Sequence, residues 1–223
     1  MTQVTTALVL AKAPIAGRVK TRLAVDVGHQ VAADLAAAAL LDTLDLVDEA
    51  FSDGPRIVAV AGDLSAAERS EELAHKVRGW TVISQRGGTF AERIGHAHAD
   101  VHEITGSGVL QIGMDTPHLV PTMLLEAVAA LTDHDAVLGP AEDGGWWLLG
   151  LNDPRLAALL RDVPMSRPET GDLTMAALTD RVDVHTTSTT YDVDTAAEAE
   201  RAATDSPQTR FAAGWRALDR TPR

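Results

Sequence analysis

The chain of 223 residues contains no cysteine and no long apolar run. The absence of cysteine excludes disulfide bonds, thiolate nucleophiles and cysteine-ligated zinc. No apolar stretch reaches the roughly 20 residues that a membrane-spanning helix needs, and the N-terminal residues lack the basic region of a signal peptide. We therefore expect a cytoplasmic protein that does not bind membranes.

Positive charge is also scarce, because 19 lysines and arginines stand against 32 aspartates and glutamates, which gives a net charge of −13. Nonspecific binding to nucleic acid or to anionic membranes needs a basic surface, so the charge balance argues against both. The length, 45% apolar residues and 23% charged residues are ordinary for one globular domain with a substantial core.

Apolar runs that predict strands alternate with segments that predict helices, which is the pattern of an α/β protein with a mostly parallel sheet. The predicted strands are 6–11, 56–61, 80–84, 108–113, 136–140, 146–151 and 182–185. The predicted helices are 27–50, 63–77 with Asp63 as N-cap, those that begin near Phe90 and Pro121, 171–182, and one after Thr195. We expect one domain over residues 1–205, and a tail over 206–223 whose order the sequence leaves open.

The segment after the first predicted strand is basic, against the acidic background of the chain. It reads AKAPIAGRVKTRL over residues 11–23. Arg18, Lys20 and Arg22 are two positions apart, so in an extended loop they point to one side. Gly17 allows close backbone approach or a positive φ, and strand-to-loop transitions often present free N–H groups to phosphate. The loop predicts an anion-binding site; the alternative is a solubilising surface turn.

Acidic residues recur where predicted strands end, and ligands of open α/β sheets bind beyond the carboxyl ends of the strands. Asp115 follows the fourth strand, Glu142 and Asp143 follow the fifth, and Asp192 or Asp194 lies near the end of the chain. Carboxylates repel a phosphate unless a divalent cation lies between them. Magnesium is typically held by one or two carboxylates together with substrate phosphates. This edge of the sheet therefore predicts a metal and phosphate site.

Each of these acids also has a purely structural interpretation. Asp115 suits a turn or a helix cap, and either Asp194 or Thr195 suits the N-cap of the following helix. The pair 142–143 adjoins two glycines, where a tight turn alone would account for the acids. Trp146 and Trp147 would point to opposite faces of a strand, so one belongs to the core and the other can face a cleft. Residues 167–170 are a candidate for a mobile flap, although no sequence pattern demonstrates one.

Four segments, in this order, resemble a bacterial glycosyltransferase-like family long catalogued as a domain of unknown function. They read AKAPIAGRVKTRL, IGMDTPHL, VLGPAEDGGWWLLGL and YDVDTAAEAE. Some members of that family are described as arsenosugar-biosynthesis glycosyltransferases, and the chain is also similar to phospholactate guanylyltransferases. The resemblance implies a single-domain, GT-A-like (Rossmann-like) three-layer sandwich of the nucleotide-diphosphosugar transferase type, with helices on both faces of a mostly parallel sheet.

The resemblance also implies roles for residues in this chain. The donor phosphates would be bound by Lys12, Gly17, Arg18, Lys20 and Arg22. Asp115 and Asp194 would hold Mg²⁺ or Mn²⁺, and Glu142 and Asp143 would border the acceptor pocket. If the reaction is glycosyl transfer, Asp143 or Glu142 is the candidate catalytic base. The acceptor pocket would be formed by Gly144, Gly145 and Trp146. The chain departs from the family where Met114 replaces a usual serine and where tryptophans 146–147 replace tyrosines.

These features predict a metal-dependent transferase that uses an activated nucleotide donor and a small-molecule acceptor. The family resemblance favours glycosyl transfer from a nucleotide sugar, with loss of a nucleoside diphosphate. The lone Asp115 and the late Asp194 favour the alternative, nucleotidyl transfer from a nucleoside triphosphate with loss of pyrophosphate. A nucleotide-binding module without turnover would keep the same fold. The sequence leaves the base, the sugar, the acceptor and the oligomeric state undetermined.

Overall fold

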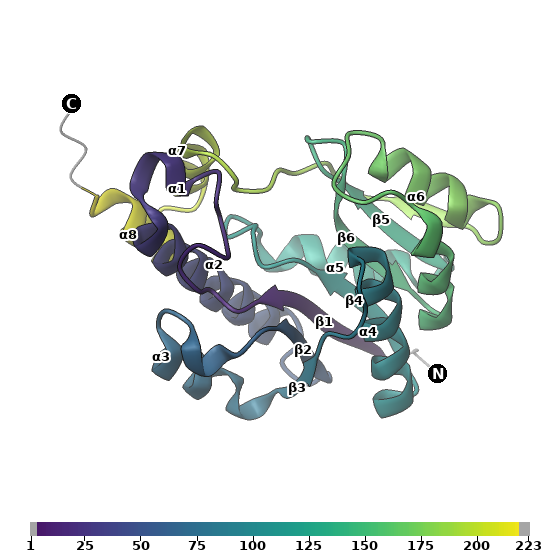
Figure 1. The fold of residues 1–223 in the computed structure, drawn as a ribbon. Helices are drawn as coiled ribbons and strands as arrows, with labels where there is room; N and C mark the ends of the chain where they lie inside the picture. The colour runs from purple at the N-terminus through teal and green to yellow at the C-terminus, as the bar shows by residue number, and fades with distance from the viewer. Residues whose placement is uncertain (1–3, 219–223) are drawn as a thin grey trace.

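The strands pair in one sheet of order β3-β2-β1-β4-β6-β5-β7 in the computed structural model, which describes residues 4–218 (Figure 1). Their bounds are β1 Thr5–Lys12, β2 Arg56–Ala61, β3 Thr81–Ser84, β4 Gly108–Ile112, β5 Ala136–Pro140, β6 Trp146–Leu151 and β7 Val184–Thr186. The pairings β1–β2, β1–β4, β2–β3 and β5–β7 are parallel, whereas β6 runs antiparallel to β4 and β5. The carboxyl ends of the other six strands therefore meet at one edge.

Helices cover both faces of the sheet. Their bounds are α1 Ala24–Val27, α2 His29–Ala50, α3 Ser70–Lys76, α4 Phe90–Thr105, α5 Pro121–Ala130, α6 Thr170–Thr179, α7 Ala196–Asp205 and α8 Arg210–Arg216, with 3₁₀ segments η1 Leu64–Ala66, η2 Val77–Gly79 and η3 Pro154–Asp162. Side chains alternate along β1: Val9 packs in the cluster with α2, α3 and α5, and Leu8 packs in the cluster with α4, η3 and α6. This three-layer arrangement confirms the predicted α/β fold class.

The helix predicted from Asp63 through Val77 is wrong as a single element. Asp63 does act as a cap, because its Oδ1 accepts a hydrogen bond from Ser65 N at 2.8 Å, but the segment it caps is the short η1. The chain then breaks at Arg69, whose φ is +53°. The Arg69 guanidinium donates two 2.7 Å hydrogen bonds to Asp34 on α2. A contact with a distant helix therefore fixes the break, and α3 starts only at Ser70.

Part of the segment that the sequence left open, residues 206–218, is packed on the domain. Phe211 and Trp215 of α8 are 1% and 2% exposed and lie in a third apolar cluster with α2 and α7. Residues 219–223 of the predicted tail, and residues 1–3 of the predicted domain, lie outside the described residues. Within the described part of the chain, no helix has both the length and the apolar character needed to cross a bilayer.

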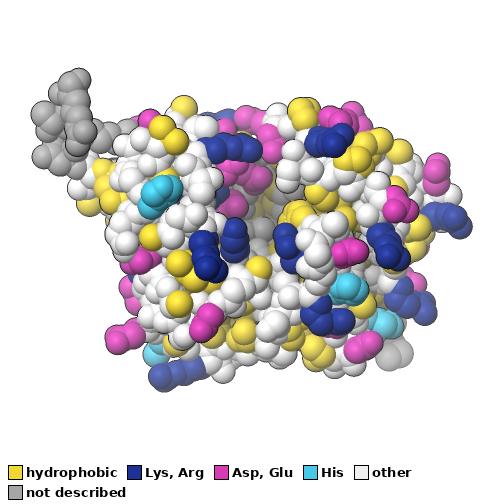
Figure 2. Space-filling view, viewed as in Figure 1, with side chains coloured by type: hydrophobic (Ala, Val, Ile, Leu, Met, Phe, Trp, Pro, Cys, Tyr) yellow, Lys and Arg dark blue, Asp and Glu magenta, His cyan; other side chains and the backbone are white. Residues whose placement is uncertain are grey.

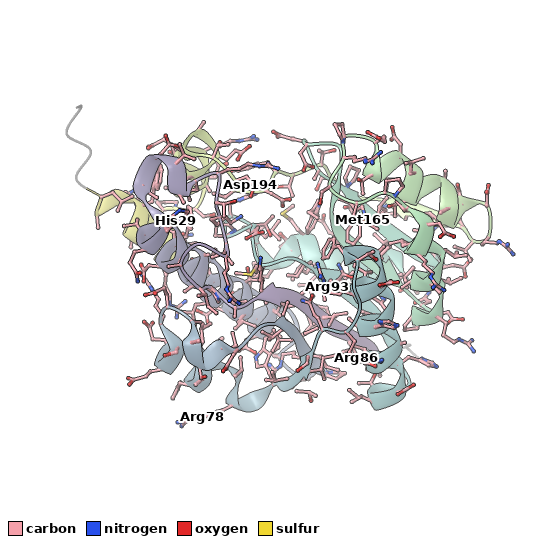
Figure 3. The ribbon with its side chains drawn as sticks, in the orientation of Figure 1. His29, Arg78, Arg86, Arg93, Met165 and Asp194 are labelled. Carbon is pink, nitrogen blue, oxygen red and sulfur yellow. The ribbon has the colours of Figure 1, made fainter. Side chains whose placement is uncertain are left out.

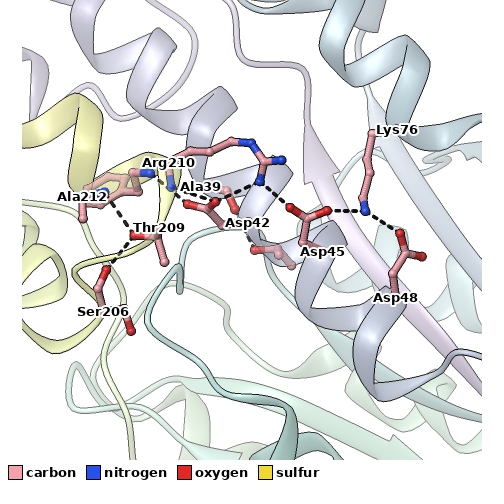
Figure 4. A network of polar contacts seen from close by, with 11 residues as sticks. Ala39, Asp42, Asp45, Asp48, Lys76, Ser206, Thr209, Arg210 and Ala212 are labelled. Atoms are coloured by element: carbon pink, nitrogen blue, oxygen red, sulfur yellow. Dashed lines mark hydrogen bonds and ion pairs between the residues drawn. The ribbon is translucent and has the colours of Figure 1, made fainter.

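Three aspartates on one side of α2 attach α8 and α3 to it (Figure 4). Asp42 accepts hydrogen bonds from the backbone N–H groups of Arg210 and Phe211 at 3.0 and 2.9 Å. Asp45 pairs with both Arg210 and Lys76, and Lys76 also pairs with Asp48. The long helix thus provides the acceptors for the first turn of α8.

Candidate active site

A cleft of about 650 Å³ opens at the carboxyl edge of the sheet. Its floor includes the ends of β1 and β2 and the residues after β3 and β4, and the segment 165–168 lines another side. Figure 2 shows this hollow near the middle of one face, with acidic side chains on its upper wall and basic side chains about its rim. The volume lies within the range of small-molecule sites.

Lys20 holds two of the predicted acids together. Its Nζ lies 2.8 Å from Asp115 Oδ1 and 3.2 Å from Asp194 Oδ1, although Asp194 is 174 positions away in the chain. The Lys20 side chain is only 4% exposed, and the residue has a φ of +46°. Arg22, at the cleft surface, adds a hydrogen bond from Nη1 to Asp194 Oδ2 at 3.0 Å. The basic loop and the two aspartates therefore form one cluster.

Asp192 is a third carboxylate of this cluster, and the sequence named it only as an alternative to Asp194. The pKa of Asp192 is raised to about 7, chiefly by burial and further by repulsion from the carboxylates of Asp115, Asp143 and Asp194. The positive charge of Lys20 lowers it. Attraction to Asp115 and Asp194 outweighs desolvation at Lys20, so its pKa is raised and it stays an ammonium. The three aspartates of the cluster, which form one wall of the cleft with Lys20, carry more negative charge than Lys20 alone neutralises.

Thr195, and not Asp194, caps α7. The Thr195 hydroxyl accepts from Glu198 N, and the Glu198 carboxylate accepts from the N–H groups of Asp194 and Thr195 at 2.7 and 2.8 Å. This capping box satisfies the free backbone donors at the start of the helix. The Asp194 side chain is thereby left for Lys20 and Arg22.

The other predicted phosphate-binding residues occupy two different places. Lys12 lines the cleft at the end of β1, together with Arg22. Gly17, with a φ of +76°, and Arg18 are exposed on the loop, and among the described residues they are not part of the cleft lining. Gly17 takes the left-handed conformation that glycine favours.

Glu142 faces away from the cleft into an ion pair. Both of its carboxylate oxygens accept from Arg201 on α7, at 2.8 and 2.9 Å. Arg201 also lies 3.7 Å above the Tyr191 ring, which stacks on His118 with ring centroids 3.9 Å apart. Hydrogen bonding to Arg201 lowers the pKa of Glu142. Asp143, by contrast, lines the cleft, although its Oδ1 accepts from Gly145 N at 2.8 Å.

The turn at 144–145 is packed against the segment that contains Pro168 and Gly171. Gly144 has a φ of +85°, and a Cβ built there would lie 1.9 Å from Pro168 O. Gly171 N donates to Gly144 O at 2.7 Å, and Thr170 Oγ1 accepts from Arg167 N and donates to Pro164 O. The predicted flap over 167–170 is therefore hydrogen-bonded to its surroundings. Gly145 and Trp146 line the cleft, and the two tryptophans lie in the apolar clusters of opposite sheet faces, as predicted.

A divalent cation fits the chemistry of this wall when a phosphate is present. Among residues 4–218, no three His, Asp or Glu side chains are grouped so that they could hold a metal ion. Asp115 and Asp194 nevertheless share one cationic partner, and Mg²⁺ commonly takes one or two carboxylates and completes its shell with substrate phosphates and water. Burial, and after it repulsion from Asp115, Asp143 and Asp194, raises the pKa of Asp192 at the same place, so a cation bound there would relieve part of that repulsion.

Two polar cleft residues escaped the sequence interpretation. Gln111, in β4, is 2% exposed, and its Oε1 lies 2.8 Å from Nε2 of the buried His98. Arg93 enters the cleft from α4. A glutamine inside the apolar run GVLQIG was a visible signal for the first residue. No local pattern distinguishes Arg93 from a surface arginine.

Comparisons with solved structures show the same fold in other proteins. A candidate nucleotide-diphospho-sugar transferase of Desulfovibrio desulfuricans G20 is 23% identical and superposes with a TM-score of 0.82 over 96% of this chain and 94% of that one. CMP:2-keto-3-deoxy-manno-octonic acid synthetase in complex with CTP is 13% identical, with a TM-score of 0.56 over 92% and 99%. Rv0371C of Mycobacterium tuberculosis H37Rv in complex with manganese is 18% identical, with a TM-score of 0.55 over 89% and 98%.

No curated protein matches the chain. A family model does match it, over residues 43–167, which is more than half of the chain. The matched part carries Asp115 and the turn at 142–145, and the rest of the charged cluster is contributed by segments on either side of it. The chain belongs to the family described as uncharacterized protein conserved in bacteria (DUF2064).

Proposed function

We propose that the protein is a metal-dependent transferase that acts on a nucleotide donor, and that it transfers the nucleotidyl group. The observation that carries the proposal is the joining of Asp115 and Asp194 by Lys20 beside a cleft that cations also line. The shared fold with a CTP-bound synthetase and a manganese-bound protein supports it. The exposed cations Lys12 and Arg22 would bind the triphosphate.

Asp115 and Asp194 would hold a magnesium or manganese ion, which supplies charge neutralisation for the phosphates when bound. Lys20 has a positioning role, because its buried ammonium holds the two carboxylates toward each other. Lys12 and Arg22 would stabilise the negative charge that grows on the leaving pyrophosphate. An acceptor oxyanion attacks the α-phosphorus, the bond from the α-phosphorus to the bridging oxygen breaks, and pyrophosphate leaves with that electron pair.

The family resemblance in the sequence favoured glycosyl transfer, but the ion pair of Glu142 favours nucleotidyl transfer. An acceptor hydroxyl that attacks a sugar needs a base, whereas a phosphate or carboxylate acceptor is already ionised. Both oxygens of Glu142 are bound by Arg201, and its lowered pKa makes it a weak base. Glycosyl transfer is the second candidate because Asp143 lines the cleft and its Oδ1, which accepts from Gly145 N, leaves Oδ2 for an acceptor hydroxyl.

Product analysis tests the proposal. The protein is incubated with each nucleoside triphosphate and with nucleotide sugars, with Mg²⁺ or Mn²⁺ and a panel of small acceptors, and pyrophosphate and nucleoside diphosphate are measured. We expect metal-dependent pyrophosphate release that falls about a hundredfold or more in Asp115→Asn and Asp194→Asn. Release of nucleoside diphosphate from a nucleotide sugar would instead establish glycosyl transfer. If no nucleotide shifts the melting temperature with or without metal, both forms of the proposal fail.

A further inference from the structure

Arg93 is a cleft arginine without a carboxylate partner in the described part of the chain. It rises from the first turns of α4 toward the cleft, whereas Arg78 points away from the molecule (Figure 3). Its Nε is buried and has no hydrogen-bond partner. The adjacent carboxylate, Glu92, accepts from the N–H groups of Gly88 and Thr89 instead, as part of the α4 capping box. In a chain of net charge −13, an unpaired and partly buried guanidinium is an exception.

The Arg93 guanidinium lies beside an aromatic ring of the same cleft. Its Cζ lies 5.6 Å from the centroid of the Phe90 ring, a cation–π distance, and both side chains line the cleft. A buried N–H group without a partner is costly unless a ligand supplies the acceptor. The planar donor fork of arginine matches the oxygen pairs of carboxylate and phosphate groups, which it can bind with two parallel hydrogen bonds.

Gln111, on the strand against which α4 packs, offers a second donor to the same cleft. If His98 Nε2–H donates to Gln111 Oε1, the His98 nitrogen left without a partner, Nδ1, is an acceptor and not an orphaned donor. The cheaper arrangement is therefore the one in which the Gln111 amide nitrogen faces the cleft. Arg93 and Gln111 thus both present N–H groups to it.

We propose that Arg93, assisted by Gln111, binds an anionic group of the acceptor, a carboxylate or a phosphate. This inference rests on the proposed function only in calling the ligand an acceptor. The donor phosphates are assigned to Lys12 and Arg22, next to Asp115 and Asp194. Arg93 comes from α4, on the other side of the cleft from Asp194 (Figure 3). The substrate class is thus a small organic acid or phosphate ester and not a neutral sugar or alcohol.

Binding of four simple probes tests the proposal: glycerol 3-phosphate, glycerate, 3-phosphoglycerate and glycerol. They are titrated by calorimetry into the wild type, Arg93→Gln, Arg93→Lys and the matched control Arg78→Gln, an exposed arginine outside the cleft. We expect at least one anionic probe to bind the wild type and glycerol not to bind. Arg93→Gln should weaken that binding about tenfold or more, which is the loss of one charge-assisted hydrogen bond. Arg93→Lys should keep part of it and Arg78→Gln all of it. The phosphate and carboxylate probes tell which group Arg93 prefers.

The affinity for manganese-loaded CTP is measured in parallel, and Arg93→Gln should leave it within about twofold of wild type. The proposal is overturned if no anionic probe binds the wild type, or if Arg93→Gln binds the anionic probes as tightly as the wild type does. It is also overturned if Arg93→Gln lowers the affinity for CTP as much as the affinity for the probes. Failure of CTP and of every other nucleoside triphosphate to bind the wild type would count against the proposed function, while the probe titrations still decide the role of Arg93.

Discussion

Lys20 is the residue on which the candidate site depends. Its ammonium is buried and contacts two aspartates whose side chains remain 42% and 39% exposed. The backbone of Lys20 has a positive φ. A buried charge of this kind is tolerated only while its partners are present, and the partners in turn repel one another without it. The sequence analysis grouped Lys20 with Arg18 and Arg22 as phosphate-binding residues. The structure gives Lys20 a structural role as well, because it joins the two aspartates.

Replacing Lys20 by alanine should lower the free energy of unfolding by about 2–3 kcal/mol, below the usual cost of breaking a buried pair because the aspartates are partly solvated. Added Mg²⁺ should restore more stability to Lys20→Ala than to the wild type, since a divalent cation can replace the missing charge. Urea titrations with and without Mg²⁺ measure both effects, with Lys12→Ala as control. A Lys20→Ala protein as stable as wild type would contradict this structural role.

At the scale of helices and strands, the sequence predicts the helix ends that local residues determine and misses those whose partners lie far away in the chain. The capping boxes at Thr89 and Thr195 and the proline that starts α5 lie within one turn of the helices they begin, so the sequence carries them. The break at Arg69 and the start of α8 instead make hydrogen bonds to Asp34 and Asp42 of α2. No window of sequence around either element contains those partners.

The attachment of α8 gives a test at this scale. Asp42→Ala removes the acceptor for two backbone N–H groups and for Arg210, so it should lower the free energy of unfolding by about 2 kcal/mol. Glu49→Ala, at an exposed position of the same helix, should change it by less than about 0.5 kcal/mol. Denaturation curves measure both, and hydrogen exchange of α8 amides should rise in Asp42→Ala alone. Unchanged protection of α8 would show that apolar packing suffices to hold it.

At the scale of the whole molecule, the sheet was predictable and the site only in part. Alternating strands and helices placed Asp115 and Asp143 on one edge by topology alone. The burial of Lys20, the pKa of Asp192 and the pairing of Glu142 with Arg201 arise only when segments far apart in the chain meet. Residue type and local order therefore located the cleft but not the partners inside it.

The stability of the molecule should depend on pH through buried histidines. Burial lowers the pKa of His98 from 6.5 to about 4, so the unfolded chain binds its proton first as the pH falls. The contribution of His98 is complete above pH 6.5 and is lost between 6.5 and about 4, about 3 kcal/mol in all. His98→Gln should thus be less stable than wild type at pH 7, and the gap should shrink toward pH 4. A gap independent of pH in urea titrations would refute the neutral, buried state of His98.

The link from Lys20 to Asp194 has a consequence for the order of events during synthesis. Every strand of the sheet is complete at Thr186, and Asp192 and Asp194 follow it. A nascent chain that has emerged to that point can form its sheet while Lys20 still lacks Asp194. The cluster of Lys20, Asp115 and Asp194 can therefore assemble only after the segment before α7 has been synthesised, and a newly made molecule cannot bind a ligand at that cluster before then.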